Sequence, residues 1–274
     1  MPYVGNTDSD RRTMLDALGN EDVAELFADI PAEHRFPKLS LPAPLSELEA
    51  HQRASELAEQ NAGGSRALSF AGAGAYHHFV PSVVSYLAGR GEFATAYTPY
   101  QAEASQGTLQ TIFEYQSMMA ALLEMDVVNA SHYDGATAMA EAAIMAVRVV
   151  RNRSRVLFAG NIHPDYVDVA RTYLRPQGIT VDVVNAPELP GSTGPDPATL
   201  LAAVDEECAA LVVQNPDFFG RVANLEGLAD AVHGKGALLV LHADPIAAAL
   251  FRSPGSLGAD IVTGEGQPLG IPVS

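Results

Sequence analysis

Positive charge is scarce in this sequence. Its 274 residues hold 16 lysines and arginines against 33 aspartates and glutamates, a formal net charge of −17, and Lys38 and Lys235 are the two lysines. A nucleic-acid-binding protein needs clustered positive charge to displace counterions from phosphates, and anionic membranes attract the same charge. We therefore expect neither nucleic acid nor a membrane as a partner. The acidic surplus mainly favours solubility.

Cysteine and long apolar runs are also scarce. The single cysteine, Cys208, excludes an internal disulfide and a cysteine metal cluster, and beside a predicted strand it indicates a buried, unreactive thiol. The longest apolar run, residues 236–251, is interrupted by His242, Asp244 and Pro245, so it is not expected to span a bilayer. The N-terminus lacks the basic start and apolar run of a signal peptide. We expect a soluble, cytoplasmic protein.

The first 65 residues are expected to form a helical arm that lies over a core or a partner. Residues 7–19 begin with capping residues and end at Gly19, and residues 21–31 repeat this helical pattern up to Pro31. After a proline-rich connector, residues 46–61 form an amphipathic pattern with a capping box at Ser46 and Glu49, ended by the glycines at 63–64.

Residues 66–274 are expected to form one large α/β domain. Strand patterns alternate with helical patterns, which predicts βαβ units and a mostly parallel sheet with helices on both faces. The predicted helices are 105–125, 135–150, 164–174, 197–207 and 224–236, and the predicted strands are 126–131, 155–160, 179–184, 210–214, 237–241 and 260–264.

Ligands of such sheets bind beyond the carboxyl ends of the strands, so the loops there deserve inspection. Residues 129–138 lead into a helix whose first N–H groups and dipole favour an anion such as phosphate, with Gly135 and Thr137 in support. Asp134 argues the other way, because as an N-cap its carboxylate already takes the anion position. A plain capped helix is the alternative interpretation.

Other loops at this edge carry polar side chains. Asp244 follows a buried strand and could pair with a protonated cofactor ring nitrogen, or serve only as a turn aspartate before proline. His242 could stack on a ring, but a core histidine is the commoner case. Asn215 and Asp217 lie in an Asn-Pro turn, a weak motif. His163 could bind a ligand or belong to a surface turn.

Two segments before the alternating region raise different hypotheses. The glycines at 72 and 74 begin like a dinucleotide-binding fingerprint, but His77 replaces the third glycine, which argues against a nicotinamide-dependent oxidoreductase. His77 and His78 are adjacent and point in different directions on a regular element, so no metal pair is expected. Polar aromatics crowd residues 97–106, and in a loop they indicate binding or an interface.

These motifs together resemble one family. Residues 72–84, 92–142, 213–220 and 259–272 are similar to the P-proteins of the glycine cleavage system, and in particular to the first subunit of the two-subunit form. The resemblance runs along nearly the whole chain. It implies a fold type I architecture of the pyridoxal-phosphate (PLP) transferases, and a heterotetramer with a homologous second subunit that carries the PLP lysine. That complex decarboxylates glycine and passes the aminomethyl group to the lipoyl arm of H-protein.

In PLP-binding relatives, a Schiff-base lysine would follow the strand after the ring-binding aspartate. Here residues 263–270 contain no lysine, and neither Lys38 nor Lys235 stands in that place. A PLP enzyme needs an amine to hold its cofactor. We therefore expect no covalent PLP on this chain, and Asp134, Gly135, Thr137 and Asp244 as remnants of a cofactor pocket.

The resemblance also suggests what the chain contributes to the complex. Because fold type I sites lie at dimer interfaces, we expect it to complete the partner's site, with no proton donor assigned. The shared-site candidates are Tyr97, Thr98, Tyr100, Gln101, Gln106, His77 and His78. A purely structural or regulatory partner is the alternative. Family members continue beyond residue 272, so we expect a fragment that lacks part of the large domain and a C-terminal domain and is unstable alone.

Overall fold

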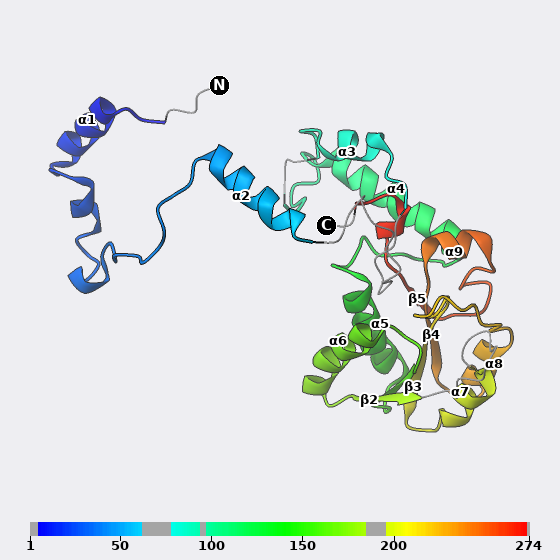
Figure 1. The fold of residues 1–274 in the computed structure, drawn as a ribbon. Helices are drawn as coiled ribbons and strands as arrows, with labels where there is room; N and C mark the ends of the chain where they lie inside the picture. The colour runs from blue at the N-terminus through cyan, green and yellow to red at the C-terminus, as the bar shows by residue number, and fades with distance from the viewer. Residues whose placement is uncertain (1–4, 62–77, 94–96, 185–195, 273–274) are drawn as a thin grey trace. The chain divides into compact units, whose positions relative to one another are not determined.

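A computed structural model (Figure 1) describes residues 5–61, 78–93, 97–184 and 196–272. The chain divides into two compact units, residues 1–69 and 70–274, and each is described by itself. In the described residues, no helix combines the length and the apolar character that a membrane crossing requires.

Within its described residues, 5–61, the first unit contains two α-helices whose starts are fixed by capping boxes. In α1 (Asp8–Leu18), Thr7 and Asp10 form the box, and in α2 (Glu47–Glu59) Ser46 and Glu49 do, as the sequence predicts. The helix predicted over 21–31 is wrong, because only the 3₁₀ helix η1 (Val23–Phe27) forms there, followed by η2 (Ala32–His34). Its apolar side chains remain exposed, and a short helix without a packed face is marginal.

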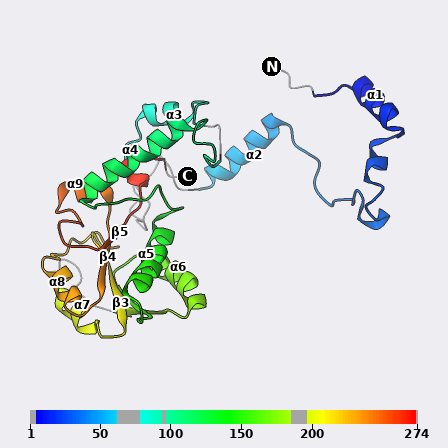
Figure 2. The ribbon, with the colours of Figure 1, turned by 180° about the vertical axis from the view of Figure 1, so that it is seen from behind.

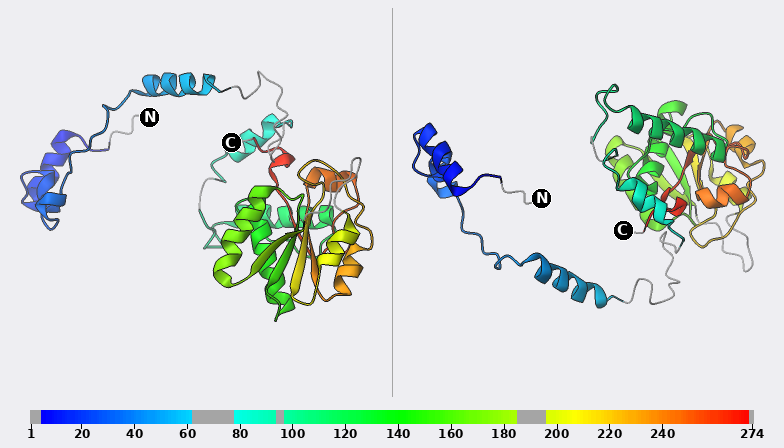
Figure 3. Two further views of the ribbon diagram at one scale, coloured as in Figure 1. Left: turned by 60° about the horizontal axis from the view of Figure 1, so that its bottom comes forward. Right: turned by 90° about the horizontal axis from the view of Figure 1, so that it is seen from above.

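The second unit is built on a parallel sheet. Within the described residues its strand order is β2-β1-β3-β4-β5, and every neighbouring pair is parallel. A parallel sheet needs helices on both faces, and Figures 1 and 3 show α5 and α6 on one face and α7 and α8 on the other. This is the α/β class that the alternating pattern predicts. The strands are β1 (Arg155–Ala159), β2 (Thr180–Val184), β3 (Cys208–Gln214), β4 (Leu238–His242) and β5 (Ile261–Thr263).

The helices follow from capping signals in the sequence. Asp134, His163, Asp196 and Asp244 each accept a backbone N–H at a helix start. Near the top of Figures 1 and 2, α4 and α9 lie side by side in both views. The helices are α3 (Ser82–Ala88), α4 (Gln106–Leu123), α5 (Gly135–Val150), α6 (Pro164–Leu174), α7 (Pro197–Ala203), α8 (Leu228–His233) and α9 (Pro245–Leu250), with short 3₁₀ turns η4 (Arg175–Gln177) and η5 (Gln267–Leu269).

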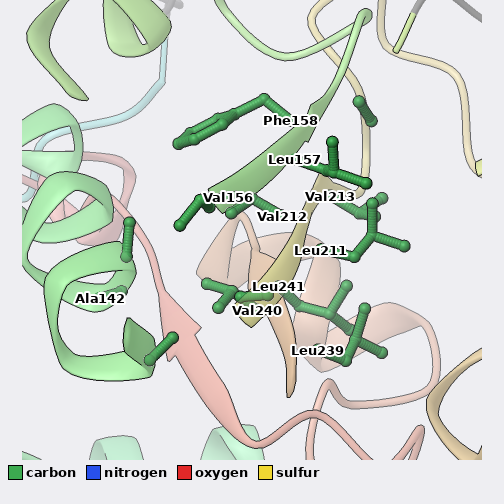
Figure 4. Packing of buried hydrophobic residues seen from close by; sticks show 14 of the residues in the cluster. Ala142, Val156, Leu157, Phe158, Leu211, Val212, Val213, Leu239, Val240 and Leu241 are labelled. Carbon is green, nitrogen blue, oxygen red and sulfur yellow. The ribbon is translucent and has the colours of Figure 1, made fainter. Parts of the chain in front are cut away.

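The core lies between the sheet and its helices (Figure 4). The three central strands contribute near-continuous apolar runs, and the alanines of α5, such as Ala142, let its backbone approach the sheet closely. Cys208 is fully buried on β3, where its Sγ lies 3.2 Å from the Ala210 carbonyl oxygen. Burial raises the pKa of the Cys208 thiol. The prediction of a buried thiol is confirmed.

Three predicted elements need correction. The strand predicted over 126–131 does not form, and Val127 there is 84% exposed. An apolar run becomes a strand only beside another strand, and none of the described strands pairs with it. The helix predicted over 197–207 ends at Ala203, because Lys235 Nζ donates to the carbonyls of Leu201 and Val204, 2.7 Å from each. The helix predicted over 224–236 is reduced to α8.

Candidate functional site

The carboxyl ends of the strands and the start of α5 meet at one edge of the sheet. In open parallel sheets, ligands bind at this edge, beside the point where the strand order reverses. Here β2 lies on one side of β1 and β3 on the other, so the reversal falls between β1 and β3. The segments after these two strands begin with residues 160–163 and 215–221.

The two segments at this reversal are joined by hydrogen bonds. Asn161 Nδ2 donates to Asp217 Oδ2 at 2.8 Å, and the Phe218 N–H donates to the Asn161 carbonyl at 2.9 Å. Asp217 is 3% exposed and also accepts Arg221 Nε at 2.7 Å and the Phe219 N–H at 2.9 Å. Asp217 is therefore the anchor of its loop, and its carboxylate is fully engaged in holding the backbone.

His163 belongs to the interior of this edge. The interpretation as a surface turn is wrong, because the side chain is buried and caps α6 by accepting the Asp165 N–H at Nδ1, 3.2 Å away. Its ring stacks on Tyr166 and meets Phe218 edge-on, with 4.8 Å between ring centroids in each case. The local sequence Pro-Asp after a histidine is a helix start, and that signal explains the placement.

His242 is a core histidine, which confirms the commoner of its two interpretations. The ring lies at the end of β4, 2.9 Å from Thr263 Oγ1 through Nδ1 and edge-on to Tyr166. Desolvation by burial, with a smaller contribution from the charge of His163, lowers the pKa of His242 to about 4. The imidazole is therefore neutral near pH 7.

The start of α5 is occupied by two carboxylates of the chain itself. Asp134 is the N-cap, and its Oδ1 accepts the Thr137 N–H at 2.7 Å. Glu265, from the loop after β5, accepts the Gly135 N–H through Oε2 at 2.9 Å. The approach is close on the other side as well, since a Cβ on Gly135 would lie 3.0 Å from His242 and from the Tyr166 hydroxyl. The capped-helix interpretation of this loop is confirmed.

The residues at this edge do not fit a covalently bound PLP. Asp244 Oδ1 accepts the Ala247 N–H at 2.9 Å as the N-cap of α9, which matches its interpretation as a turn aspartate. Lys235 precedes β4 at the opposite edge, where its amine holds the end of α7. The β5–η5 loop holds no lysine. The start of α5 is thus taken by Asp134 and Glu265, one carboxylate oxygen of Asp244 caps α9, and the loop after β5 offers no amine.

The polar aromatic segment before α4 is exposed instead. Tyr97 and Tyr100 are 100% and 91% exposed, and Thr98 and Gln101 are exposed with them. A turn joins them, with the Tyr100 N–H 2.8 Å from the Thr98 carbonyl. Gln106 is the first residue of α4 and is also exposed.

The two candidate histidines differ in what can be said of them. His78 Nε2 lies 3.0 Å from the Ile271 carbonyl oxygen and 3.3 Å from Gln267 Nε2, so its ring contacts the loop after β5. His77 and the glycines at 72 and 74 lie outside the described residues.

Sequence reasoning missed two features of this region. One is Glu265, whose only sequence signal is an acidic residue after a strand that ends beside a helix start. The other is an open groove of about 380 Å³ beside the first turn of α5. It is lined by Ser131, His132, Tyr133, Thr137, Glu141 and Tyr173. In the described part of the chain, no cluster of histidine, cysteine and carboxylate side chains could hold a metal ion.

Comparison with known proteins gives a consistent set of matches. The family model described as glycine cleavage system P-protein matches residues 1–274. The probable glycine dehydrogenase (decarboxylating) subunit 1 of Thermomicrobium roseum is 49% identical over the whole chain, and that of Chlorobium phaeobacteroides 48% identical over 98% of it. The chain spans about 60% of the length of each of these relatives.

Solved structures agree with these matches. The crystal structure of an inhibitor-bound glycine decarboxylase (P-protein) of the glycine cleavage system superposes on this chain with a TM-score of 0.87 and 42% identity. The match covers the whole of this chain and 60% of that one. A Burkholderia pseudomallei sphingosine-1-phosphate lyase, at 18% identity and a TM-score of 0.58 over 89% of this chain and 59% of its own, shares the fold. The fold is that of the fold type I PLP-dependent enzymes.

Proposed function

The chain belongs to the glycine cleavage system P-protein family, and from that premise we propose that it is the first subunit of a two-subunit glycine dehydrogenase (decarboxylating). The complex would decarboxylate glycine and transfer the aminomethyl group to the lipoyl arm of H-protein. The proposed partner is a homologous second subunit that holds PLP, in a cytoplasmic heterotetramer. When bound there, PLP supplies the electron sink for the carbon that loses carbon dioxide.

The exposure of Tyr97 and Tyr100 is the main support for the proposal that this chain completes the site of its partner. Two tyrosines at 100% and 91% exposure place large amphipathic rings and hydroxyls in solvent, an arrangement typical of residues that a partner covers. The cofactor edge of this chain is meanwhile filled by its own carboxylates. Both observations support a chain that completes a neighbouring site rather than holding a cofactor itself.

The side chains of the shared-site candidates are suited to positioning the substrate. The hydroxyls of Tyr97, Thr98 and Tyr100 can donate to a glycine carboxylate or a cofactor phosphate. The amides of Gln101 and Gln106 can donate to the same anions, with His78 and His77 as further candidates. We assign no proton donor among them. Their contribution is to orient the carboxylate and to remove water from it before carbon dioxide leaves.

Exchange of labelled bicarbonate into glycine, with H-protein present, tests the proposal. The natural full-length subunit, a PLP-bearing second subunit and their mixture are assayed in parallel. Activity only in the mixture supports a shared site. Activity in this subunit alone would show that another amine holds PLP, and that this chain binds the cofactor after all.

A tyrosine-to-phenylalanine pair separates catalytic support from assembly. Tyr100→Phe removes one hydroxyl and should lower exchange by about 10-fold, the scale of one transition-state hydrogen bond, while the complex still forms. Tyr86→Phe, at an exposed tyrosine on α3, is the matched control and should change nothing. Unchanged exchange in Tyr100→Phe, with loss of assembly on Tyr100→Ala, would favour a purely structural or regulatory partner.

A further inference from the structure

The first turn of α5 binds carboxylates from two distant parts of the sequence. The N–H of Gly135, the first residue of the helix, donates to Glu265 Oε2 at 2.9 Å. The N–H of Thr137 donates to Asp134 Oδ1 at 2.7 Å. Asp134 is a local cap, but Glu265 comes from the loop after β5, 130 positions away. Its bond to Gly135 therefore joins two elements of the fold.

Gly135 at one end of this hydrogen bond, and Gly264 next to Glu265 at the other, have no side chain that would keep the two elements apart. A Cβ on Gly135 would meet His242 Cε1 and the Tyr166 hydroxyl at 3.0 Å each. A Cβ on Gly264, next to Glu265, would lie 2.6 Å from the Ala243 carbonyl oxygen. The loop after β5 thus passes against the end of β4, and Glu265 is half-buried between that strand end and α5.

Further hydrogen bonds link Glu265 to the rest of its loop and to His78, one of the shared-site candidates, which contacts that loop. Glu265 Oε1 accepts the Gln267 N–H at 3.3 Å, which fixes the start of η5. Gln267 Nε2 donates to the Ile271 carbonyl at 2.8 Å and lies 3.3 Å from His78 Nε2. His78 Nε2 is 3.0 Å from the same carbonyl oxygen. A connected series of contacts thus runs from α5 to His78.

We propose that Glu265 is a positioning residue whose carboxylate takes the place of a bound anion at the start of α5. A negative group there is stabilised by the free N–H groups and by the helix dipole, as a bound phosphate would be. Because this anion belongs to the loop after β5, it also holds that loop, with Gln267 and His78, against α5. The catalytic consequence rests on the proposed function, whereas the structural part stands apart from it.

Rescue by a small anion tests the proposal on the natural full-length subunit without its partner. Glu265→Ala should lower the melting temperature by about 2–6 °C, since a charge-assisted hydrogen bond and a loop contact are lost. Formate is small enough to enter the space of the missing carboxylate and should restore at least half of that shift. Formamide, neutral and of the same size, should restore none at equal ionic strength. Glu206→Ala, at an exposed glutamate before β3, is the matched control and should respond to neither compound.

Glu265→Gln keeps the shape of the side chain and removes only its charge, so it carries the test if the alanine variant does not fold. It should melt below the wild type at low salt, by about half of the alanine shift where that shift can be measured, because the charge–dipole part is lost. A glutamine variant as stable as the wild type would overturn the proposal. Equal rescue of Glu265→Ala by formate and formamide would do the same.

Exchange activity in the complex with the second subunit tests the positioning role. Below its melting temperature, Glu265→Ala should exchange bicarbonate about 3- to 10-fold more slowly, and formate should recover the rate together with the melting temperature. A thermal rescue without any loss of exchange would overturn the positioning role. If the mixture of the two subunits shows no exchange while formate still rescues the melt of Glu265→Ala, the proposed function fails and the structural inference about Glu265 holds.

Discussion

His242 makes the stability of the second unit dependent on pH. Its ring is buried at the end of β4, its Nδ1 lies 2.9 Å from Thr263 Oγ1, and Tyr166 covers it edge-on. Burial, assisted by His163, lowers the pKa of His242 from 6.5 to about 4. Because the folded-state pKa lies below the unfolded value, this stabilisation is fully present above pH 6.5 and is lost as the pH falls toward about 4.

The size of the effect follows from the two pKa values. Between pH ~7.5 and pH ~5 the unfolded chain gains most of a proton at this histidine while the folded protein gains almost none. Linkage then gives a loss of about 2 kcal/mol in the free energy of unfolding over that range, from this one group. Such a loss is a large fraction of the stability of an ordinary domain.

The variant that isolates this contribution is His242→Asn. The asparagine amide can keep the hydrogen bond to Thr263 Oγ1, but it does not titrate. The smaller side chain should cost about 1–3 kcal/mol at every pH through the space it leaves. What distinguishes the histidine is the difference between the two pH values, which should be about 2 kcal/mol smaller in the variant than in the wild type.

Urea unfolding followed by far-ultraviolet circular dichroism measures these free energies, and the natural full-length chain at pH ~7.5 and pH ~5 is the sample. His51→Asn, at an exposed histidine on α2, is the control and should leave the pH dependence of the wild type unchanged. An equal pH dependence in His242→Asn and in the wild type would refute the lowered pKa of His242 in the folded protein. It would mean that this histidine either titrates normally when folded or becomes exposed well before the pH reaches ~5.

Three further predictions concern groups buried in the second unit. Asp217→Ala removes the acceptor of several loop hydrogen bonds and leaves Arg221 without its ion-pair partner, so urea unfolding should show a loss of about 2–4 kcal/mol. Gly135→Ala places a methyl group 3.0 Å from His242 and Tyr166 and should cost about 1–3 kcal/mol in the same assay; no change would show that the packing can relax. The Cys208 thiol should not react with a disulfide reagent in the folded protein and should react fully in urea, and rapid reaction without urea would contradict its burial.

Helices with clear capping residues can be predicted from this sequence. The ranges expected for α5 and α6 agree with the structure because Asp134 and the His-Pro pair at 163–164 fix their starts. The sequence patterns give wrong or incomplete predictions where tertiary contacts determine the secondary structure. Residues 126–131 have the composition of a strand but no pairing partner among the described strands, and α9 follows an Asp-Pro pair whose capping role the sequence leaves open.

The position of the candidate site at the sheet edge could be predicted from the sequence, but not all of the side chains that fill it. The carboxyl edge of a parallel sheet follows from the alternating pattern, and Asp134 as a cap follows from the residues around it. Glu265 could not be found in this way, because its bond to Gly135 spans 130 positions and depends on how β5 lies beside β4. His163 was missed as an interior group because a histidine before proline looks the same in a surface turn as in a buried helix cap.

The hydrogen bonds of the carboxylates at the sheet edge affect where a ligand can bind. At the carboxyl edge, Asp134, Asp217, Asp244 and Glu265 all accept backbone N–H groups or ion-pair partners from this chain. A ligand that used the engaged oxygens would have to break charge-assisted bonds before forming its own. Tyr97 and Tyr100 carry no such cost, because their side chains lie in solvent and lose only water on binding. This difference supports the proposal that the exposed segment before α4, rather than the sheet edge, meets the substrate of a partner.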